Sequence, residues 1–179
     1  MVAASWLQIV VYLGLLVLLG KLLGDYMARV YEGRATLLTR PLGPLERLLY
    51  RIAGSQATAE MSWRGYAVAV LIFNLAGLLV VFLLQRFQGH LPWNPQHLPG
   101  VAPDLALNTA ASFASNTNWQ SYSGESTLSY LTQMLGLTVQ NFLSAATGMA
   151  VLVALIRGLT RHTVQEIGNF WTDLTRTTL

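Results

Sequence analysis

Cysteine is absent from this chain of 179 residues, and charged residues are scarce. Without cysteine there is no disulfide bond, no thiolate metal ligand and no cysteine nucleophile. Charged residues make up 11% of the sequence, whereas they account for about a quarter of a typical soluble domain. With 53% hydrophobic residues, this scarcity of charge predicts an integral membrane protein. The net charge of +3 is modest and does not indicate a nucleic-acid partner.

Motifs for nucleotide binding and catalysis are lacking as well. The sequence contains no nucleotide-binding glycine loop and no phosphorylatable aspartate motif. Its three histidines and eight acidic residues show no grouping that would form a nucleophile–base pair or a metal cluster. His90 and His97 have no acidic residue near them that would complete a metal site, so we expect them to be surface histidines. An integral membrane enzyme is therefore the weaker functional class.

Three hydrophobic segments are long enough to cross a bilayer, which takes about 20 apolar residues. The first is residues 3–23, within a leading segment 1–23. No Lys or Arg precedes it, which favours a retained helix over a cleaved signal peptide. The second is residues 65–87, where Asn74 lies at mid-membrane and is expected to bond to a neighbouring helix, with a role along an ion path as the alternative. The third is residues 126–157.

The third segment is unusually polar for a helix in lipid. Its amides and hydroxyls predict that one face meets protein or water. Ser144 and Gly148 lie four residues apart, which predicts a close helix contact at this position, and Thr147 and Ala150 widen the small-residue region.

Most of the positive charge lies in residues 24–64, between the first two hydrophobic segments. The positive-inside rule places this loop in the cytoplasm and the N-terminus outside. Within it, residues 43–54 predict an amphipathic helix with Pro44 near its start and Gly54 at its end. This helix either lies on the bilayer surface, with basic residues toward lipid phosphates, or docks a cytoplasmic partner. Residues 158–179 are expected to form a second cytoplasmic segment.

The stretch between the second and third hydrophobic segments has the layout of a re-entrant pore loop. Residues 88–103 contain four prolines and predict an ordered extracytoplasmic loop. Residues 104–114 predict a short pore helix, with Asp104 as its N-terminal cap. Residues 115–120 are polar, uncharged and favour turns over helix. Non-helical backbone occurs at membrane depth only where protein buries it or where it lines a water-filled cavity.

Residues 115–120 are where we expect a cation to bind. Backbone carbonyls can replace the water shell of an ion without adding net charge. The carbonyl ladder would come from Ser115, Asn116, Thr117, Asn118 and Trp119. The C-terminal dipole of the short helix would point toward the ion. Glu125 either adds negative potential at the outer mouth or simply favours a helix N-terminus, and the Trp119 side chain is expected to anchor or pack the loop.

Several motifs resemble one known family. The most specific are residues 115–125 (Ser-Asn-Thr-Asn-Trp-Gln-Ser-Tyr-Ser-Gly-Glu), 128–130 (Leu-Ser-Tyr) and 136–146 (Gly-Leu-Thr-Val-Gln-Asn-Phe-Leu-Ser-Ala-Ala). Supporting motifs are residues 60–63, 91–96 and 104–110. They resemble the KdpA family, the potassium-binding component of the Kdp potassium-transporting P-type ATPase, and the similarity covers the whole chain.

The resemblance implies an all-α integral membrane protein of the potassium-channel and transporter superfamily. Family members are built from four consecutive helix–pore loop–helix units around a filter with pseudo-fourfold symmetry. This chain would supply a leading transmembrane helix and the first unit, in a bacterial or archaeal inner membrane. The resemblance places the first filter strand on Asn116, Thr117 and Asn118, with Ser115 where a threonine is common, and gives Gln120 a supporting role.

By the same resemblance, the chain binds and translocates potassium in an ATP-driven, high-affinity uptake complex without itself hydrolysing ATP. The implied partners are the P-type ATPase component KdpB, the single-helix component KdpC and the small component KdpF, with the lipid bilayer around them. Since family members are much longer, we expect the chain to be a piece of a longer protein. The alternative is a passive potassium channel in which single pore-loop units self-assemble.

Overall fold

The structure is a computed structural model that describes residues 2–34, 36, 38–54, 59–162 and 165–179. Most of these residues are in helices. Within the described residues, one isolated antiparallel β-bridge joins Ser62 and Glu166. The chain divides into two compact units, Met1–Leu48 and Leu49–Leu179. Each unit is described by itself.

The first unit contains helix α1 (Val2–Tyr31) and the beginning of helix α2. Helix α1 is apolar enough to cross a membrane, and it continues beyond residue 23, the predicted end of the hydrophobic segment. Arg29 in the last turn favours this extension, because a cation is stabilised near a helix C-terminus. Gly33 follows with a φ angle of 71°, a left-handed conformation that commonly ends helices.

In helix α2 (Thr39–Ile52), Pro44 lies at a different position from the predicted one. The helix begins before Pro44, which therefore lies inside it instead of near its start. Pro41 fits in the first turn, where a missing N–H group has no helical partner to lose. Pro44 lacks the N–H group that would bond to the carbonyl of Arg40, and the helix continues through this residue. Gly54 follows the helix with a φ angle of 64°, so the predicted stop at this residue is confirmed.

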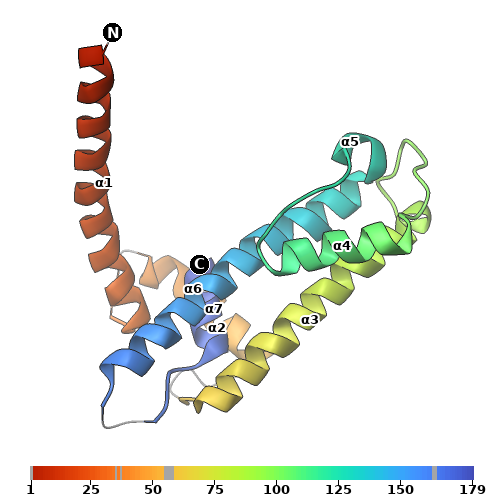
Figure 1. Ribbon diagram of the computed structural model, residues 1–179. Coiled ribbons are helices and arrows are strands. Elements are labelled where there is room, and N and C mark those ends of the chain that lie inside the picture. Colours follow the sequence, from red (N-terminus) through yellow and green to blue (C-terminus); the bar gives the residue numbers. More distant parts are fainter. Residues whose placement is uncertain (1, 35, 37, 55–58, 163–164) are drawn as a thin grey trace. The chain divides into compact units, whose positions relative to one another are not determined.

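The second unit is built on two long helices. In chain order its elements are α3 (Trp63–Phe87), the 3₁₀ turn η1 (Gln88–His90), α4 (Pro103–Ala114), α5 (Gly124–Thr127), the π-helix η2 (Thr132–Thr138), α6 (Val139–Thr160) and α7 (Phe170–Thr178). Helix α3 packs beside η2 and α6, and the short α4 packs along one end of α3 (Figure 1). By length and composition, three stretches of the described residues are able to cross a membrane: Trp6–Tyr31, Trp63–His90 and Thr132–Thr160.

Two apolar clusters hold the second unit together. One joins α3, α4 and η2 and contains Val81, Val101, Ala106, Ala110, Phe113, Leu128 and Leu137. The other joins α3, α6 and α7 and contains Tyr66, Ala69, Ala146, Ala150, Ala154, Phe170 and Leu174. Three of the α6 positions are alanines spaced four apart, which lets α3 and α7 approach the α6 backbone closely.

The small-residue contact predicted on α6 is wrong only at Gly148. Gly148 is exposed, and a Cβ atom at this position would have no neighbour within 4 Å. Ser144 is buried, as are Ala146 and Ala150, so the packed face of α6 is rotated away from Gly148. Helix α6 does pack through small residues, and Ser144, Thr147 and Ala150 of the predicted region are all buried, so only Gly148 lies off the packed face.

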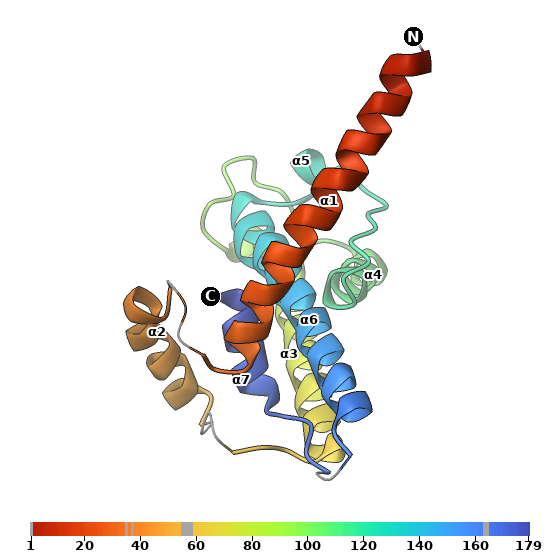
Figure 2. The same cartoon turned by 90° about the vertical axis from the view of Figure 1, so that its left-hand side faces the viewer.

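Residues 165–179 fold back onto the unit. Helix α7 packs against α6 and α3 and buries Phe170 and Asp173 (Figure 2). The Phe170 ring makes edge contacts with Tyr66 and Phe73, with ring centroids 5.6 and 5.7 Å apart. Asp173 forms a buried ion pair with Arg157, which the sequence did not predict. The cytoplasmic placement of this segment stays a prediction.

Asn74 does not bond to a neighbouring helix as expected. Its Nδ2 atom donates to the carbonyl of Val70, one turn earlier in the same helix, at 2.9 Å. The polar contact between α3 and α6 comes instead from Tyr66, whose hydroxyl donates to the carbonyl of Ala150 at 2.8 Å, while the Gln140 side chain on α6 is buried against Gly77 on α3.

We expect Gly77→Ala to destabilise the second unit by about 1–3 kcal/mol, the usual cost of overpacking a core. An added Cβ would lie 2.6 Å from Oε1 of Gln140, so this buried side chain (3% exposed) would have to shift. Thermal unfolding in detergent measures the effect. Gly65→Ala in the same helix is the control, because its Cβ would have no neighbour closer than 3.7 Å. Equal melting temperatures for the two variants would contradict this account.

Candidate ion-binding site

Gln88 fixes the loop that leads to the site. Its side chain is fully buried, and its Nε2 atom donates to the carbonyls of Pro99 and Thr127 at 2.7 and 2.8 Å. Its Oε1 atom accepts from the N–H of Ser129 at 3.0 Å. One amide therefore joins the end of α3 to the proline-rich loop on one side and to the start of the next long helix on the other.

Helix α4 carries the site at its C-terminal end. It begins at Pro103, and Ala102 is the N-cap without a side-chain hydrogen bond, so the prediction that Asp104 caps the helix is wrong. Asp104 lies in the first turn, where its carboxylate still faces the positive end of the helix dipole. The proline takes the first helical position because its missing N–H group would have had no partner there.

The N–H groups of residues 115–118 all point back to the last turn of α4. Ser115 N donates to Ala111 O at 3.0 Å, and Asn116 N donates to Phe113 O at 3.3 Å. The N–H groups of Thr117 and Asn118 both donate to Ser112 O, at 2.9 and 3.2 Å. The carbonyls that a helix end normally leaves without partners are satisfied in this way. The segment is not helical, yet all four of its backbone N–H groups are hydrogen-bonded.

The carbonyl groups of residues 115–118 are left free. None of them accepts a hydrogen bond from the part of the chain that the structure describes. Asn116 and Asn118 have φ angles of 56° and 55°, whereas Ser115 has a φ angle of −87°. Both asparagines therefore adopt the left-handed conformation, which residues other than glycine rarely take. We call the four free oxygens, which belong to consecutive residues, the carbonyl row.

Side chains brace this segment in two pairs. The hydroxyls of Ser115 and Thr117 lie 2.9 Å apart, and Ser115 Oγ donates to Ala111 O. The Nδ2 atom of Asn118 donates to Oδ1 of Asn116 at 3.2 Å. Ser144 Oγ, on α6, donates to the same Oδ1 at 3.3 Å. Hydroxyl side chains thus tie the segment to α4, and amide side chains tie it to α6.

Two residues that hold the site are not marked as such by the sequence. The sequence predicts for Ser144 only a small residue suited to helix packing. Ser112, inside the short helix, donates from Oγ to the carbonyl of Trp119 at 2.9 Å and closes the turn. Ser112 lies in the last turn of α4 and Ser144 lies on α6. Neither spacing nor composition distinguishes these two serines from the other serines of the chain.

The remaining candidates are exposed in this chain. Trp119 is 59% exposed, and Gln120 and Glu125 are also exposed. Gln120 makes no hydrogen bond to the described residues, so its supporting role stays a prediction. Glu125 lies in the first turn of α5, which agrees with the simpler of its two interpretations.

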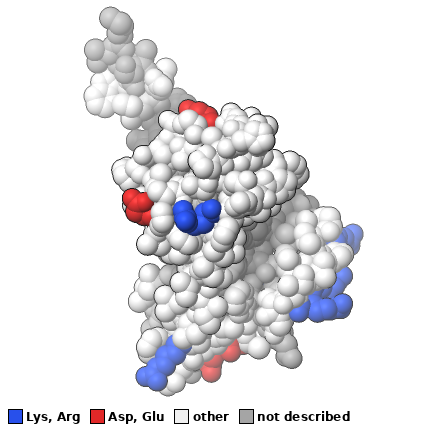
Figure 3. Space-filling model, turned by 90° about the vertical axis from the view of Figure 1, so that its right-hand side faces the viewer, with Lys and Arg blue, Asp and Glu red and all other residues white. Residues whose placement is uncertain are grey.

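Titratable groups contribute little near the segment. No group of three or more His, Asp or Glu side chains that would hold a metal occurs among the described residues. Burial raises the pKa of the Tyr122 phenol, and the neighbouring Thr109 hydroxyl lowers it by a smaller amount, so Tyr122 stays neutral. On the face shown in Figure 3, charged side chains are few and wide areas are uncharged.

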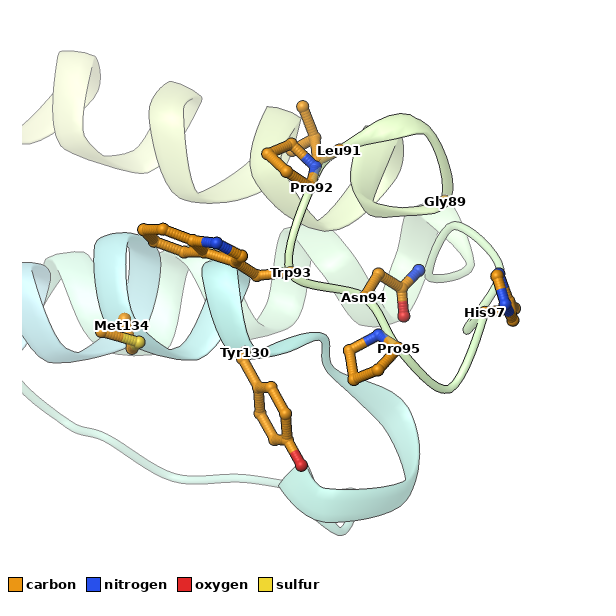
Figure 4. A pocket seen from close by; sticks show the side chains of 9 residues that line it. All are labelled: Gly89, Leu91, Pro92, Trp93, Asn94, Pro95, His97, Tyr130 and Met134. Carbon is orange, nitrogen blue, oxygen red and sulfur yellow. The ribbon is translucent and has the colours of Figure 1, made fainter.

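A groove lies at the loop end of the second unit, but it does not suit an ion. Trp93 and Pro95 from the loop lie near Tyr130 and Met134 (Figure 4). The Asn94 amide is used inside the loop, where its Nδ2 atom donates to Leu98 O at 2.8 Å. The groove is lined mainly by apolar and aromatic groups, so residues 115–118 remain the better cation site.

Comparison with known proteins decides the family. The model of the family described as KdpA, potassium-transporting ATPase A subunit, matches residues 10–179. The chain belongs to the KdpA family. Proteins named potassium-transporting ATPase potassium-binding subunit from Sorangium cellulosum, Methylococcus capsulatus and Rhodospirillum centenum are 65%, 64% and 63% identical to it over all 179 residues.

The KdpA match covers all of the chain but only part of its relatives. The chain spans 31%, 30% and 31% of the lengths of these three proteins. The predicted class, an all-helical membrane protein related to KdpA, is confirmed. The match includes the segment whose carbonyls are free, so this arrangement occurs within the KdpA part of the sequence.

Proposed function

We propose that Ser115, Asn116, Thr117 and Asn118 form one strand of a potassium filter. One observation carries the proposal: the backbone N–H groups of this segment are hydrogen-bonded to α4, whereas its carbonyl groups are free. A row of free carbonyls replaces the water shell of a monovalent cation. The C-terminal end of α4 adds a partial negative charge behind the row.

One strand cannot surround an ion. The filter therefore needs three further strands, which we assign to the part of the relatives' length that this chain does not span. The full-length protein is then the potassium-binding and translocating component of an ATP-driven uptake complex. Its expected partners are the P-type ATPase component KdpB, the single-helix component KdpC and the small component KdpF. We expect it in the inner membrane with the N-terminus outside, since the loop of residues 24–64 is basic.

The test of this proposal compares Asn118→Ala with Asn118→Gly in the full-length protein. Both substitutions remove the amide that bonds to Asn116, but only glycine adopts the left-handed conformation without strain. Alanine there costs about 1–2 kcal/mol, so the half-saturating potassium concentration for uptake should rise about five- to thirtyfold relative to the glycine variant. Uptake of labelled potassium into vesicles, with and without ATP, measures it.

Two outcomes would contradict the proposal. Equal potassium affinity for the alanine, glycine and unsubstituted proteins would show that the conformation of residue 118 does not matter for the ion. Uptake that needs no ATP would favour the passive channel over the ATP-driven transporter.

A further inference from the structure

Ser144 makes a contact that the other residues near the filter strand do not make. Its hydroxyl donates to Oδ1 of Asn116, 28 residues earlier, at 3.3 Å. Within the described residues, no other hydrogen bond joins residues 115–120 to α6. All the other bonds of this segment run to α4 or to its own residues. Ser144 is therefore the polar link between the strand and the long helix behind it.

The packing of α6 fixes the position of Ser144 independently of its bond to Asn116. Its side chain is 4% exposed, on the packed face of α6 that also carries Ala146 and Ala150. The same Oγ atom lies 3.3 Å from the carbonyl of Asn141, so the hydroxyl is shared between its own helix and the strand. A hydroxyl on a rigid, buried helix face is a fixed reference point for a segment that has no regular secondary structure.

The Asn116 amide passes this constraint to the second left-handed residue. Its Oδ1 atom accepts from Ser144 Oγ and also from Nδ2 of Asn118. Asn116 and Asn118 are the two residues of the segment with positive φ angles, and each also contributes one oxygen to the carbonyl row. One oxygen atom thus connects both of them to α6, while Ser115 and Thr117 are tied to α4.

The geometry points to Ser144 as a positioning residue for ion selection. By holding Asn116, and Asn118 through it, the Ser144 hydroxyl keeps the carbonyl row at one distance from the ion path. Without it the strand is fixed only to the end of its own short helix, and the row is free to shift toward a smaller or larger ion. This inference rests on the proposed function, since it concerns the same carbonyl row.

The experiment replaces Ser144 with alanine in the full-length transporter. Ser144→Ala removes one hydroxyl and little volume. We expect the half-saturating potassium concentration to rise about two- to tenfold, the worth of one hydrogen bond, and competition by sodium and rubidium to increase. The amount of folded protein and its melting temperature should change little. A changed ion preference is the readout that a merely structural role would not move.

Thr147→Val is the matched control. Thr147 is also buried on α6, but its hydroxyl donates to the carbonyl of Leu143 in the same helix. Valine has the shape of threonine and lacks only the hydroxyl. We expect this variant to keep the potassium affinity and ion preference of the unsubstituted protein.

A double-mutant cycle tests whether Ser144 acts through Asn116. If it does, Ser144→Ala should have no further effect on affinity or ion preference once Asn116→Ala is present. Ser144→Cys keeps the side-chain length with a weaker donor and should give a smaller loss than alanine. If Ser144→Ala does not accumulate, the cysteine variant decides by the same readouts.

The results separate this inference from the proposed function. If Ser144→Ala behaves like Thr147→Val while Asn118→Ala weakens potassium affinity, the carbonyl row binds the ion but Ser144 does not position it. If neither Ser144→Ala nor Asn118→Ala changes affinity or ion preference, the proposed function itself is wrong. An effect of Ser144→Ala that is fully additive with Asn116→Ala also overturns the positioning role.

Discussion

Asp173→Asn should destabilise the full-length protein by about 3–5 kcal/mol, the cost of leaving one partner of a buried ion pair alone. The Asp173 side chain is 1% exposed, and its two oxygens receive the Arg157 guanidinium at 2.5 and 2.9 Å. The Tyr66 hydroxyl donates to the same carboxylate at 3.1 Å. Three helices, α3, α6 and α7, therefore meet at one charge. Thermal unfolding and the yield of folded protein in detergent measure the loss.

The control is a second bidentate pair with a different environment. Arg161 holds the Glu60 carboxylate at 2.7 and 3.0 Å, but these side chains are 33% and 40% exposed. Water screens an exposed pair, so Glu60→Gln should cost at most about 1 kcal/mol. Replacing Arg157 and Asp173 together by methionine and leucine should recover part of the stability lost in Asp173→Asn, because no buried charge is then left unpaired. A stability cost that is equal for the two pairs would refute this account.

Gly100→Ala should prevent the loop before α4 from taking its native path. A Cβ atom at residue 100 would collide with the backbone carbonyl of Arg86 in the last turn of α3, which cannot move aside as a side chain can. Next to it, Val101 N donates to Gln85 O at 3.0 Å, so the same clash breaks a bond that aligns the loop with α3. We expect a loss at or above the usual cost of overpacking, about 1–3 kcal/mol.

Gly89→Ala in the same loop region is the matched variant for Gly100→Ala. Its Cβ would have no neighbour closer than 3.6 Å, an ordinary contact, so this variant should fold and transport normally. Since the loop sets where α4 begins, Gly100→Ala should lower both the folded yield and potassium uptake. Normal uptake by folded Gly100→Ala protein would show that the path of the loop does not position the filter strand.

The parts of the fold that depend on composition were predictable. The three apolar segments and the uncharged break after a short helix follow from hydrophobicity and turn-forming residues, and the fold class is confirmed. Helix limits were less predictable, because Pro103 and not Asp104 starts α4, and Pro44 is tolerated inside α2. These outcomes depend on how the chain arrives at each helix, which no local pattern specifies.

Polar contacts between helices were the least predictable part. The Asn74 amide donates within its own helix, whereas Tyr66, Asp173 and Ser144 carry the contacts between elements. In each case the deciding fact is which face of a helix is buried, and an apolar helix with small residues on several faces does not reveal it. The sequence predicted which residues carry the free carbonyls but not their backbone conformation. The positive φ angles of Asn116 and Asn118 are a property of the folded turn.

Every backbone N–H group in residues 115–118 donates to a carbonyl at the end of α4. This hydrogen bonding also determines which solutes the backbone of the segment does not bind. Among the backbone groups of this segment, halides and other negative solutes would meet only carbonyl oxygens, because the N–H donors are already bonded. Because those oxygens belong to peptide groups, protons cannot compete for them over the range in which cells live. Discrimination by the sign of the charge is thus a property of the main chain, and acidification of the surroundings leaves it intact.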